Sequence, residues 1–121
     1  MVLKGGRLEA YPKAIEDSIE ILEDNLKQIS SVLDWAQFMG YSRSYFSTSF
    51  TECFGEPPSK CLYRVRYRKL HKIVLKHPHE TSRAVAIRLG LRDEQALYKF
   101  LNRHYSTNFT AIRKKLLYGK K

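Results

Sequence analysis

A chain of 121 residues and 14.2 kDa has the size of one domain, or of two small lobes that share a core. With 43% hydrophobic and 28% charged residues, its composition is that of a folded protein and excludes extensive disorder. No stretch approaches the roughly 20 apolar residues that a membrane span needs, so we expect a soluble, cytoplasmic protein.

Positive charge is concentrated in the second half of the chain. The formal net charge is +10, but residues 1–57 carry −4 and residues 58–121 carry +14. Solubility does not require so steep a split, which is typical of a surface that binds a polyanion. We therefore expect nucleic acid as the partner. A membrane partner is not expected, because no helix combines a basic face with an exposed apolar face.

The sequence lacks the patterns of catalytic and metal sites. Cys53 and Cys61 form no C-x-x-C motif and are expected to be reduced thiols. His77-Pro78-His79 has no carboxylate or thiolate companions and is expected to be a solvated turn. A phosphate-binding glycine loop and a nucleophile elbow are both missing. We expect no enzyme activity, no cofactor and no metal.

The first predicted helix follows a lead or linker over residues 1–12. Apolar residues step by four, three, four and three from Ile15 to Ile29, which predicts one helix with a single buried face. Its acidic residues lie off that face. The simplest interpretation is a helix that covers a core, because barely two heptads are present for a coiled coil.

Two shorter helices are predicted next. Ser31, with Asp34 three positions later, resembles a capping box that opens a helix stopped by Gly40. Ser42 caps a second helix, which places Phe46 and Phe50 inward and ends at Phe54-Gly55. Two short helices joined by a tight glycine turn predict a helix-turn-helix, and the first lobe is assigned to residues 13–57.

Residues 58–76 predict one long linker helix. After Pro57-Pro58 the sequence contains no glycine or proline until Pro78, enough for a helix of about 27 Å. One side is apolar and the remainder is crowded with lysine and arginine, some of which we expect to be structural.

The pattern of the first lobe recurs in residues 77–118, with 119–121 as a basic tail. Ala36-x-x-x-Gly40 and Ala86-x-x-x-Gly90 are separated by 50 positions, and the Phe46/Phe50 pair recurs 51 positions later as Leu97/Leu101. Alanine permits a close helix crossing, and glycine takes positive φ without strain. Because the whole spacing recurs, a second helix-turn-helix is predicted, with Thr81 as the cap of its first helix.

Together these residues resemble the DNA-binding domain of the AraC/XylS family of bacterial transcription regulators. The resemblance implies an all-α fold of seven helices, with two helix-turn-helix lobes joined by the linker helix and two recognition helices entering successive major grooves. The second lobe departs from the family pattern. Ser106 replaces a glycine and Phe109 replaces a proline, and three leucines stand where the family has phenylalanine: Leu91, Leu97 and Leu101. The residues that carry the resemblance are Ala36, Gly40-Tyr41-Ser42, Phe46, Phe50, Gly55, the helix from Pro58 to Val74, Ala86, Gly90, Leu97, Leu101, Tyr105 and Arg113.

The first recognition helix presents hydroxyl groups outside its phenylalanine stripe. By the resemblance, Ser44, Ser47 and Thr48 are the positions that face bases. Serine and threonine accept several bases and discriminate poorly. Arg43 and Thr51 are candidates for the DNA backbone, although Arg43 is equally compatible with an ordinary solvated arginine.

The second recognition helix carries more varied chemistry. Glu94, Gln95, Tyr98 and Lys99 are candidates for base contacts, with the alternative that Glu94 caps the helix together with Asp93. Contacts with the DNA backbone require a charged or polar group but no precise orientation of the side chain. The candidates are Arg92, Asn102, Arg103, Arg113 and Lys114.

A helical protein-interaction module, or an anti-regulator acting through the acidic first helix, is the alternative function. For a regulator, the resemblance implies double-stranded DNA as the partner and association with the nucleoid. RNA polymerase is the expected second partner. A monomer is expected to suffice for binding, since two lobes supply two half-sites. A longer parent protein could dimerise through a domain outside this sequence.

Overall fold

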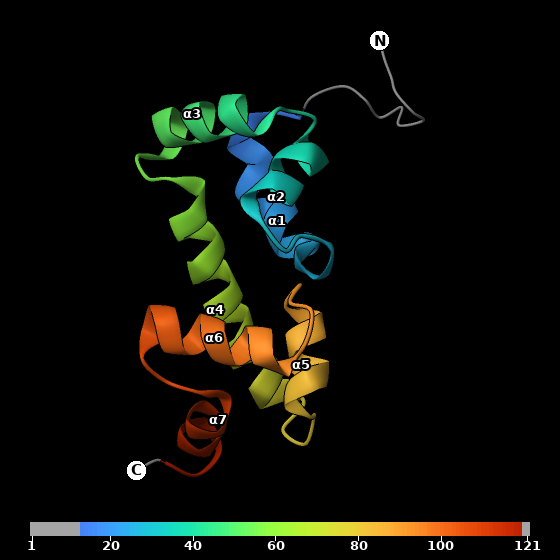
Figure 1. Ribbon diagram of the computed structural model, residues 1–121, viewed down its shortest axis with the longest axis vertical. Helices are drawn as coiled ribbons and strands as arrows, with labels where there is room; N and C mark the ends of the chain where they lie inside the picture. The colour runs from blue at the N-terminus through green and yellow to red at the C-terminus, as the bar shows by residue number, and fades with distance from the viewer. Residues whose placement is uncertain (1–12, 120–121) are drawn as a thin grey trace. The chain divides into compact units, whose positions relative to one another are not determined.

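The computed structural model describes residues 13–119, whose regular elements are helices joined by short turns (Figure 1). The expected all-α fold of seven helices is confirmed for this part of the chain, which contains no strand and no helix long and apolar enough to cross a membrane. The predicted lead, 1–12, and all but Gly119 of the predicted tail lie outside the described residues. The helices are α1 (Ser18–Asp24), α2 (Val32–Met39), α3 (Arg43–Phe54), α4 (Pro58–Lys76), α5 (Ser82–Arg88), α6 (Glu94–Tyr105) and α7 (Phe109–Tyr118).

The chain forms two compact units. Unit 1 ends at Leu62 and unit 2 begins at Tyr63, so the division falls inside α4. The long helix predicted over residues 58–76 has the bounds of α4. Each unit thus contains one predicted helix-turn-helix and a part of α4.

Trp35 is the centre of unit 1. Its ring is fully buried and meets Phe46 and Phe50 edge-on, with ring centroids 5.0 and 5.1 Å apart. Its indole Nε1 donates a hydrogen bond to the Ser18 carbonyl at 3.1 Å. Edge-to-face aromatic pairs add about 0.5–1.5 kcal/mol each beyond the burial of apolar area. One side chain of α2 therefore ties α1 and α3 to the same core.

The prediction of one continuous helix over residues 15–29 is wrong. The α-helix covers only Ser18–Asp24, and 3₁₀ turns precede and follow it at Ile15–Asp17 and Leu26–Gln28. Asn25 leaves the helical region with φ −129° and ψ 22°, and its side-chain amide donates to the Ile21 carbonyl at 2.8 Å. An asparagine that satisfies a backbone carbonyl in this way competes with helix continuation.

The start of α2 differs from a capping box by one residue. The Ser31 hydroxyl accepts from the Asp34 amide at 3.1 Å, as predicted. The Asp34 carboxylate, however, accepts from the amide and hydroxyl of Ser30, at 3.1 and 2.6 Å, rather than from the Ser31 amide. The Ser30 hydroxyl lowers the pKa of this carboxyl. The cap holds α2 through two serines instead of one.

The predicted repeat is reproduced in backbone geometry. Gly40 and Gly90 both have positive φ, at 90° and 83°. In each lobe the next amide donates to the alanine carbonyl, Tyr41 to Ala36 and Leu91 to Ala86, both at 2.9 Å. These are the bonds that close a helix end in the Schellman manner. The predicted cap of the second lobe is also confirmed, because the Thr81 hydroxyl accepts from the Ala84 amide at 3.1 Å.

Arg66 of α4 is a basic residue with a structural role. It is 3% exposed, and its Nε donates to the Leu89 carbonyl at 3.0 Å, while the guanidinium carbon lies 5.5 Å from the Phe100 ring centre. Burial lowers the pKa of Arg66 to about 10. This one side chain links α4 to the turn after α5 and to α6, within unit 2.

The two cysteines are free thiols, and the His77-Pro78-His79 segment forms a turn, as predicted. Cys53 and Cys61 are free cysteines, the first exposed and the second buried. His77-Pro78-His79 lies in the turn between α4 and α5, where the Glu80 amide donates to the His77 carbonyl at 3.2 Å.

Ser106 keeps the turn that the family builds with glycine. Its φ is 52°, and it is the one positive-φ residue other than glycine in the described chain. The equivalent position 51 residues earlier is Gly55, with φ 78°. A side chain in this left-handed region costs about 1–2 kcal/mol. The second lobe therefore retains the turn at an energetic cost.

A reciprocal exchange tests this cost. Ser106→Gly should raise the free energy of unfolding by about 0.5–1 kcal/mol, since relief of backbone strain exceeds the added freedom of the unfolded chain. Gly55→Ser should lower it by a similar amount, because nothing lies within 4 Å of an added Cβ there and only strain is introduced. Urea denaturation followed by circular dichroism measures both. A destabilised Ser106→Gly variant would contradict this account.

Candidate nucleic-acid interface

The outward face of α3 is a stripe of hydroxyl groups. Phe46 and Phe50 are fully buried, which turns Ser44, Thr48 and Thr51 to the exposed side, with Ser47 half-buried beside them. The Thr51 hydroxyl donates to the Ser47 carbonyl at 2.8 Å, so its proton is used within the helix. Thr51 can still accept a hydrogen bond from a ligand.

The start of α3 carries one cation and one exposed aromatic ring. Arg43, at the first helical position, is exposed. Tyr45 is 57% exposed, and its ring centre lies 5.0 Å from that of Tyr41. Sequence reasoning missed Tyr45, although a tyrosine lying off the Phe46/Phe50 stripe is a signal for an outward ring.

The outward face of α6 bears nearly every kind of polar group. Leu97, Phe100 and Leu101 are buried, and the side chains on the opposite face are all exposed. They supply carboxylate, amide, phenol, ammonium and guanidinium groups on two neighbouring stripes of the helix. These exposed residues are Glu94, Gln95, Tyr98, Lys99, Asn102 and Arg103.

Asp93 is the N-cap of α6. Its carboxylate accepts from the Ala96 amide at 2.9 Å, and its backbone is extended as a cap requires. Glu94 is an exposed residue of the first turn. Because Asp93 performs the capping, Glu94 keeps a carboxylate directed to solvent.

Two exposed cations near α6, Arg92 and Lys114, are only weakly held by other side chains. The Arg92 side chain is 91% exposed, and its Nε lies 4.0 Å from the Asp93 carboxylate, a loose pair. Such a pair contributes at most about 1 kcal/mol. Lys114 on α7 is exposed too. Both can turn toward a phosphate at little cost.

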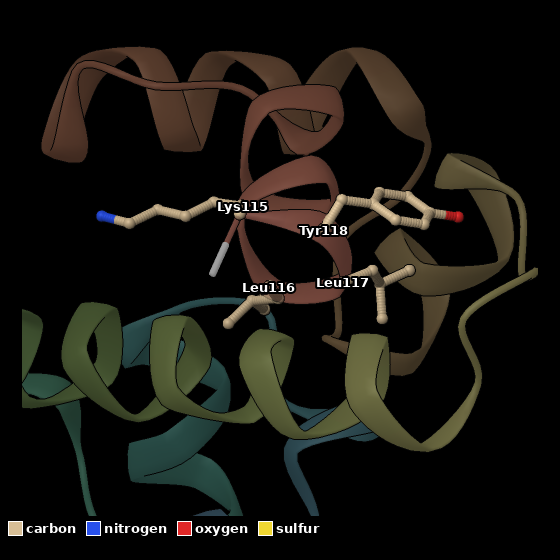
Figure 2. Close-up of a pocket in the computed structure, with 5 residues that line it drawn as sticks. Lys115, Leu116, Leu117 and Tyr118 are labelled. Atoms are coloured by element: carbon tan, nitrogen blue, oxygen red, sulfur yellow. The ribbon is translucent and has the colours of Figure 1, made fainter. Parts of the chain in front are cut away.

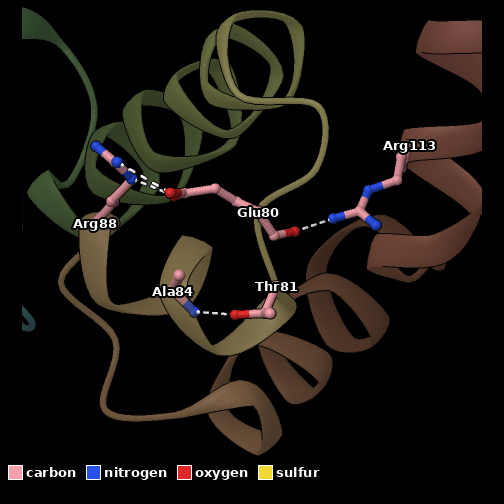
Figure 3. A network of polar contacts seen from close by, with 5 residues as sticks. All are labelled: Glu80, Thr81, Ala84, Arg88 and Arg113. Atoms are coloured by element: carbon pink, nitrogen blue, oxygen red, sulfur yellow. Dashed lines mark hydrogen bonds and ion pairs between the residues drawn. The ribbon is translucent and has the colours of Figure 1, made fainter.

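Arg113 is held inside unit 2 (Figure 3). Its guanidinium donates to the Glu80 carbonyl and lies 4.4 Å from the Phe109 ring centre. The Glu80 carboxylate in turn accepts from Arg88, whose Nη2 lies 3.2 Å from Oε2. Arg113 thus joins α7 to the segment before α5. This geometry gives the side chain a positioning role, unlike the exposed bases near it.

Aromatic rings fasten the inner face of α6 to α4. Tyr67 stacks on Tyr105 with ring centres 3.7 Å apart and an interplanar angle of 8°, and Tyr63 stacks on His104 at 3.9 Å. Phe100 lies 6.1 Å from Tyr63. These contacts fix which side of α6 is buried, and therefore which side chains face outward.

A shallow depression is lined by residues 115–119, and Figure 2 shows Leu116 and Leu117 pointing toward α4 while Lys115 and Tyr118 point to either side. Across residues 13–119, no three histidine, cysteine, aspartate or glutamate side chains gather as metal ligands would.

These two lobes define a protein with paired helix-turn-helix motifs. A family model described as a helix-turn-helix domain matches residues 35–115, which run from Trp35 in α2 to Lys115 in α7. The chain belongs to this AraC-type helix-turn-helix family, which confirms the resemblance drawn from the sequence, and it is a DNA-binding transcription regulator.

A solved structure shares the fold. It is the crystal structure of a transcriptional regulator from Chromobacterium violaceum, one of the AraC-type DNA-binding domain-containing proteins. The two chains are 16% identical, with a TM-score of 0.66 over 97% of this chain and 100% of that one. No curated protein matches the sequence at a significant level.

Two histidines of unit 2, His71 on α4 and His104 on α6, predict a dependence of stability on pH. Burial, and then Lys115, lowers the pKa of His71, whose Nε2 is buried without a hydrogen-bond partner in the described chain. Burial, and then Arg103 and Arg66, lowers the pKa of His104. The unfolded chain thus binds protons more readily, so stability is highest above the unfolded value of 6.5 and falls as pH drops through it.

Urea denaturation between about pH 7.5 and about pH 5.5, without DNA, measures this loss. His71→Gln should weaken the pH dependence, because the variant cannot be protonated there. His79→Gln, at an exposed position in the turn, is the matched control and should leave the curve unchanged. A pH dependence that is the same in all three proteins would count against His71.

Proposed function

We propose that this regulator binds duplex DNA with α3 and α6 each in a major groove, and that α6 makes most of the base-specific contacts. The observation that carries the proposal is the difference between the two exposed faces. The face of α6 offers charged and amide groups, whereas that of α3 offers mainly hydroxyls. Bidentate and charged groups discriminate between bases far better than hydroxyls do.

On α6, each proposed contact follows from the chemistry of base edges. The Gln95 amide matches the N6 and N7 groups of adenine, and the Glu94 carboxylate can accept from the amino group of cytosine. Lys99 can donate to guanine. Tyr98, 56% exposed, has an apolar ring edge that fits a thymine methyl.

On α3, Ser44, Ser47 and Thr48 would contact bases without strong preference, so this helix mainly sets position. Backbone phosphates would be met by exposed cations and by polar side chains at the edges of the two helices. We assign this role to Arg43, Thr51, Arg92, Asn102, Arg103 and Lys114, and give Arg113 the task of holding α7 in place.

A monomer with two recognition helices would be sufficient for binding. Regulation would place the chain at the nucleoid, in the cytoplasm, with RNA polymerase as its second partner. A protein-interaction module or anti-regulator remains the alternative, and the exposed acidic residues of the first helical segment, Glu16, Asp17, Glu20, Glu23 and Asp24, are its proposed surface.

Salt dependence separates these two functions. Fluorescence anisotropy with a random labelled duplex of about 40 base pairs should give an affinity that falls steeply with salt. The log–log slope should be roughly −4, for the four cations that we assign to phosphates. Absence of binding at low salt would contradict the regulator and favour the protein partner.

Lys99→Ala tests base readout by α6. On a duplex selected from a random library, the variant should bind about 10-fold more weakly, while its affinity for random DNA changes much less, because a base contact has been lost. Lys114→Ala, a phosphate contact, is the control and should weaken both equally. Equal losses for Lys99→Ala would make Lys99 a backbone contact.

Ser47→Ala and Thr48→Ala test the weaker role of α3. Each should cost less than about 1 kcal/mol of specific binding, measured by anisotropy on the same selected duplex. A loss well above that figure would show that α3 reads bases too.

A further inference from the structure

A row of cations on α4 has no part in the interface described above. Arg68, Lys69, Lys72 and Lys76 are all exposed, and α4 contains no acidic residue. Within the described chain, none of the four is within salt-bridge distance of a carboxylate. We call Arg68, Lys72 and Lys76, which recur every fourth residue, the α4 stripe. Their charges are uncompensated, in contrast to Arg88, which is paired with Glu80.

The α4 stripe lies on the side of α4 away from α6. Tyr63, Arg66 and Tyr67 are the residues of α4 that meet α6. With about 100° of rotation per residue, their mean direction is roughly 170° from that of Arg68, Lys72 and Lys76. The stripe and the α6 contacts thus occupy opposite sides of one helix.

The outward face of α6 is likewise opposite to its contacts with α4. Phe100 and His104 meet α4, whereas Gln95, Lys99 and Asn102 point the other way around the helix. Unit 2 therefore has two polar, cation-bearing faces, one on each side of the packed α4–α6 pair. A duplex bound along α6 cannot reach the α4 stripe without wrapping around the unit.

We propose that the α4 stripe binds the backbone phosphates of a second DNA duplex, so that unit 2 can bridge two duplexes. Binding of the first duplex rests on the proposed function of α6. Binding of the second duplex by the α4 stripe is independent of that function. Arg68, Lys72 and Lys76 recur every fourth residue over about 12 Å, the distance in which one DNA strand presents three or four phosphates.

The chemistry of the stripe favours a regular polyanion. Its members are long side chains with full charge, and they are spaced along a helix rather than gathered around a recess. Such a row neutralises phosphates without reading sequence. The second duplex would therefore be held in a salt-dependent way and without sequence preference.

Two-colour coincidence measures the bridge directly. A selected duplex carries a green dye and a random duplex a red one, and single complexes are scored for both colours. The wild-type protein should give coincident complexes at low salt. A triple variant, Arg68→Gln with Lys72→Gln and Lys76→Gln, should reduce coincidence at least fivefold while its affinity for the green duplex stays within about threefold.

The matched control removes the same charges from exposed positions elsewhere. Arg83→Gln with Lys27→Gln and Lys60→Gln also replaces one arginine and two lysines. It should retain coincidence within about twofold, and circular dichroism should show both variants folded. Equal loss in the two variants would mean a general charge effect and would overturn the proposal.

The outcomes separate this proposal from the function of α6. If the wild-type protein does not bind the green duplex, the proposed function fails. If it binds the green duplex but gives no coincidence, the α4 stripe does not hold DNA. Coincidence that survives the triple substitution would arise elsewhere in the chain, and it would likewise overturn the assignment.

Discussion

The turn between two short helices is the constraint on which each lobe depends. Gly40 and Gly90 take a left-handed conformation that returns the next amide to an alanine carbonyl one turn back. This closes the first helix and sets where the second begins. With Ala36 and Ala86 fully buried beside the turn, the helices cross closely, and the direction of the recognition helix follows. Every outward side chain of α3 or α6 inherits its orientation from that turn.

Packing then decides which charges are available to a ligand. Arg66 and Arg113 stabilise unit 2. Arg66 donates to the Leu89 carbonyl and Arg113 to the Glu80 carbonyl, and each guanidinium also lies over an aromatic ring. Exposed cations such as Lys99 and Arg103 have no such task. The excess of basic residues thus divides into a structural part and an exposed part that is free to meet a ligand. Net charge alone indicates a polyanion as partner. Only the contacts within the fold show which basic side chains remain free to bind it.

The sequence predicted the helices and turns well, because caps, glycines and apolar spacing are local signals. Ser31, Ser42 and Thr81 cap as expected, and the offset between the lobes is reproduced in the backbone. The break at Asn25 was missed because its neighbours keep a helical apolar pattern through the 3₁₀ turns. The partner of Arg113, 33 residues away in sequence, depends on tertiary packing. Outward positions could be predicted from periodicity, whereas the use of a side chain within the fold could not.

The outward faces of α3 and α6 differ because their surroundings differ. The two phenylalanines of α3 pack on Trp35, and its exposed hydroxyls compete with the backbone, as Thr51 does by donating to Ser47. In α6 the cap is left to Asp93, outside the helix, so that the charged and amide groups of the outer face remain available. Discrimination between bases depends on groups that are both exposed and free of contacts within the fold. This is why we propose that α6 supplies most of the sequence preference and that α3 contributes mainly position.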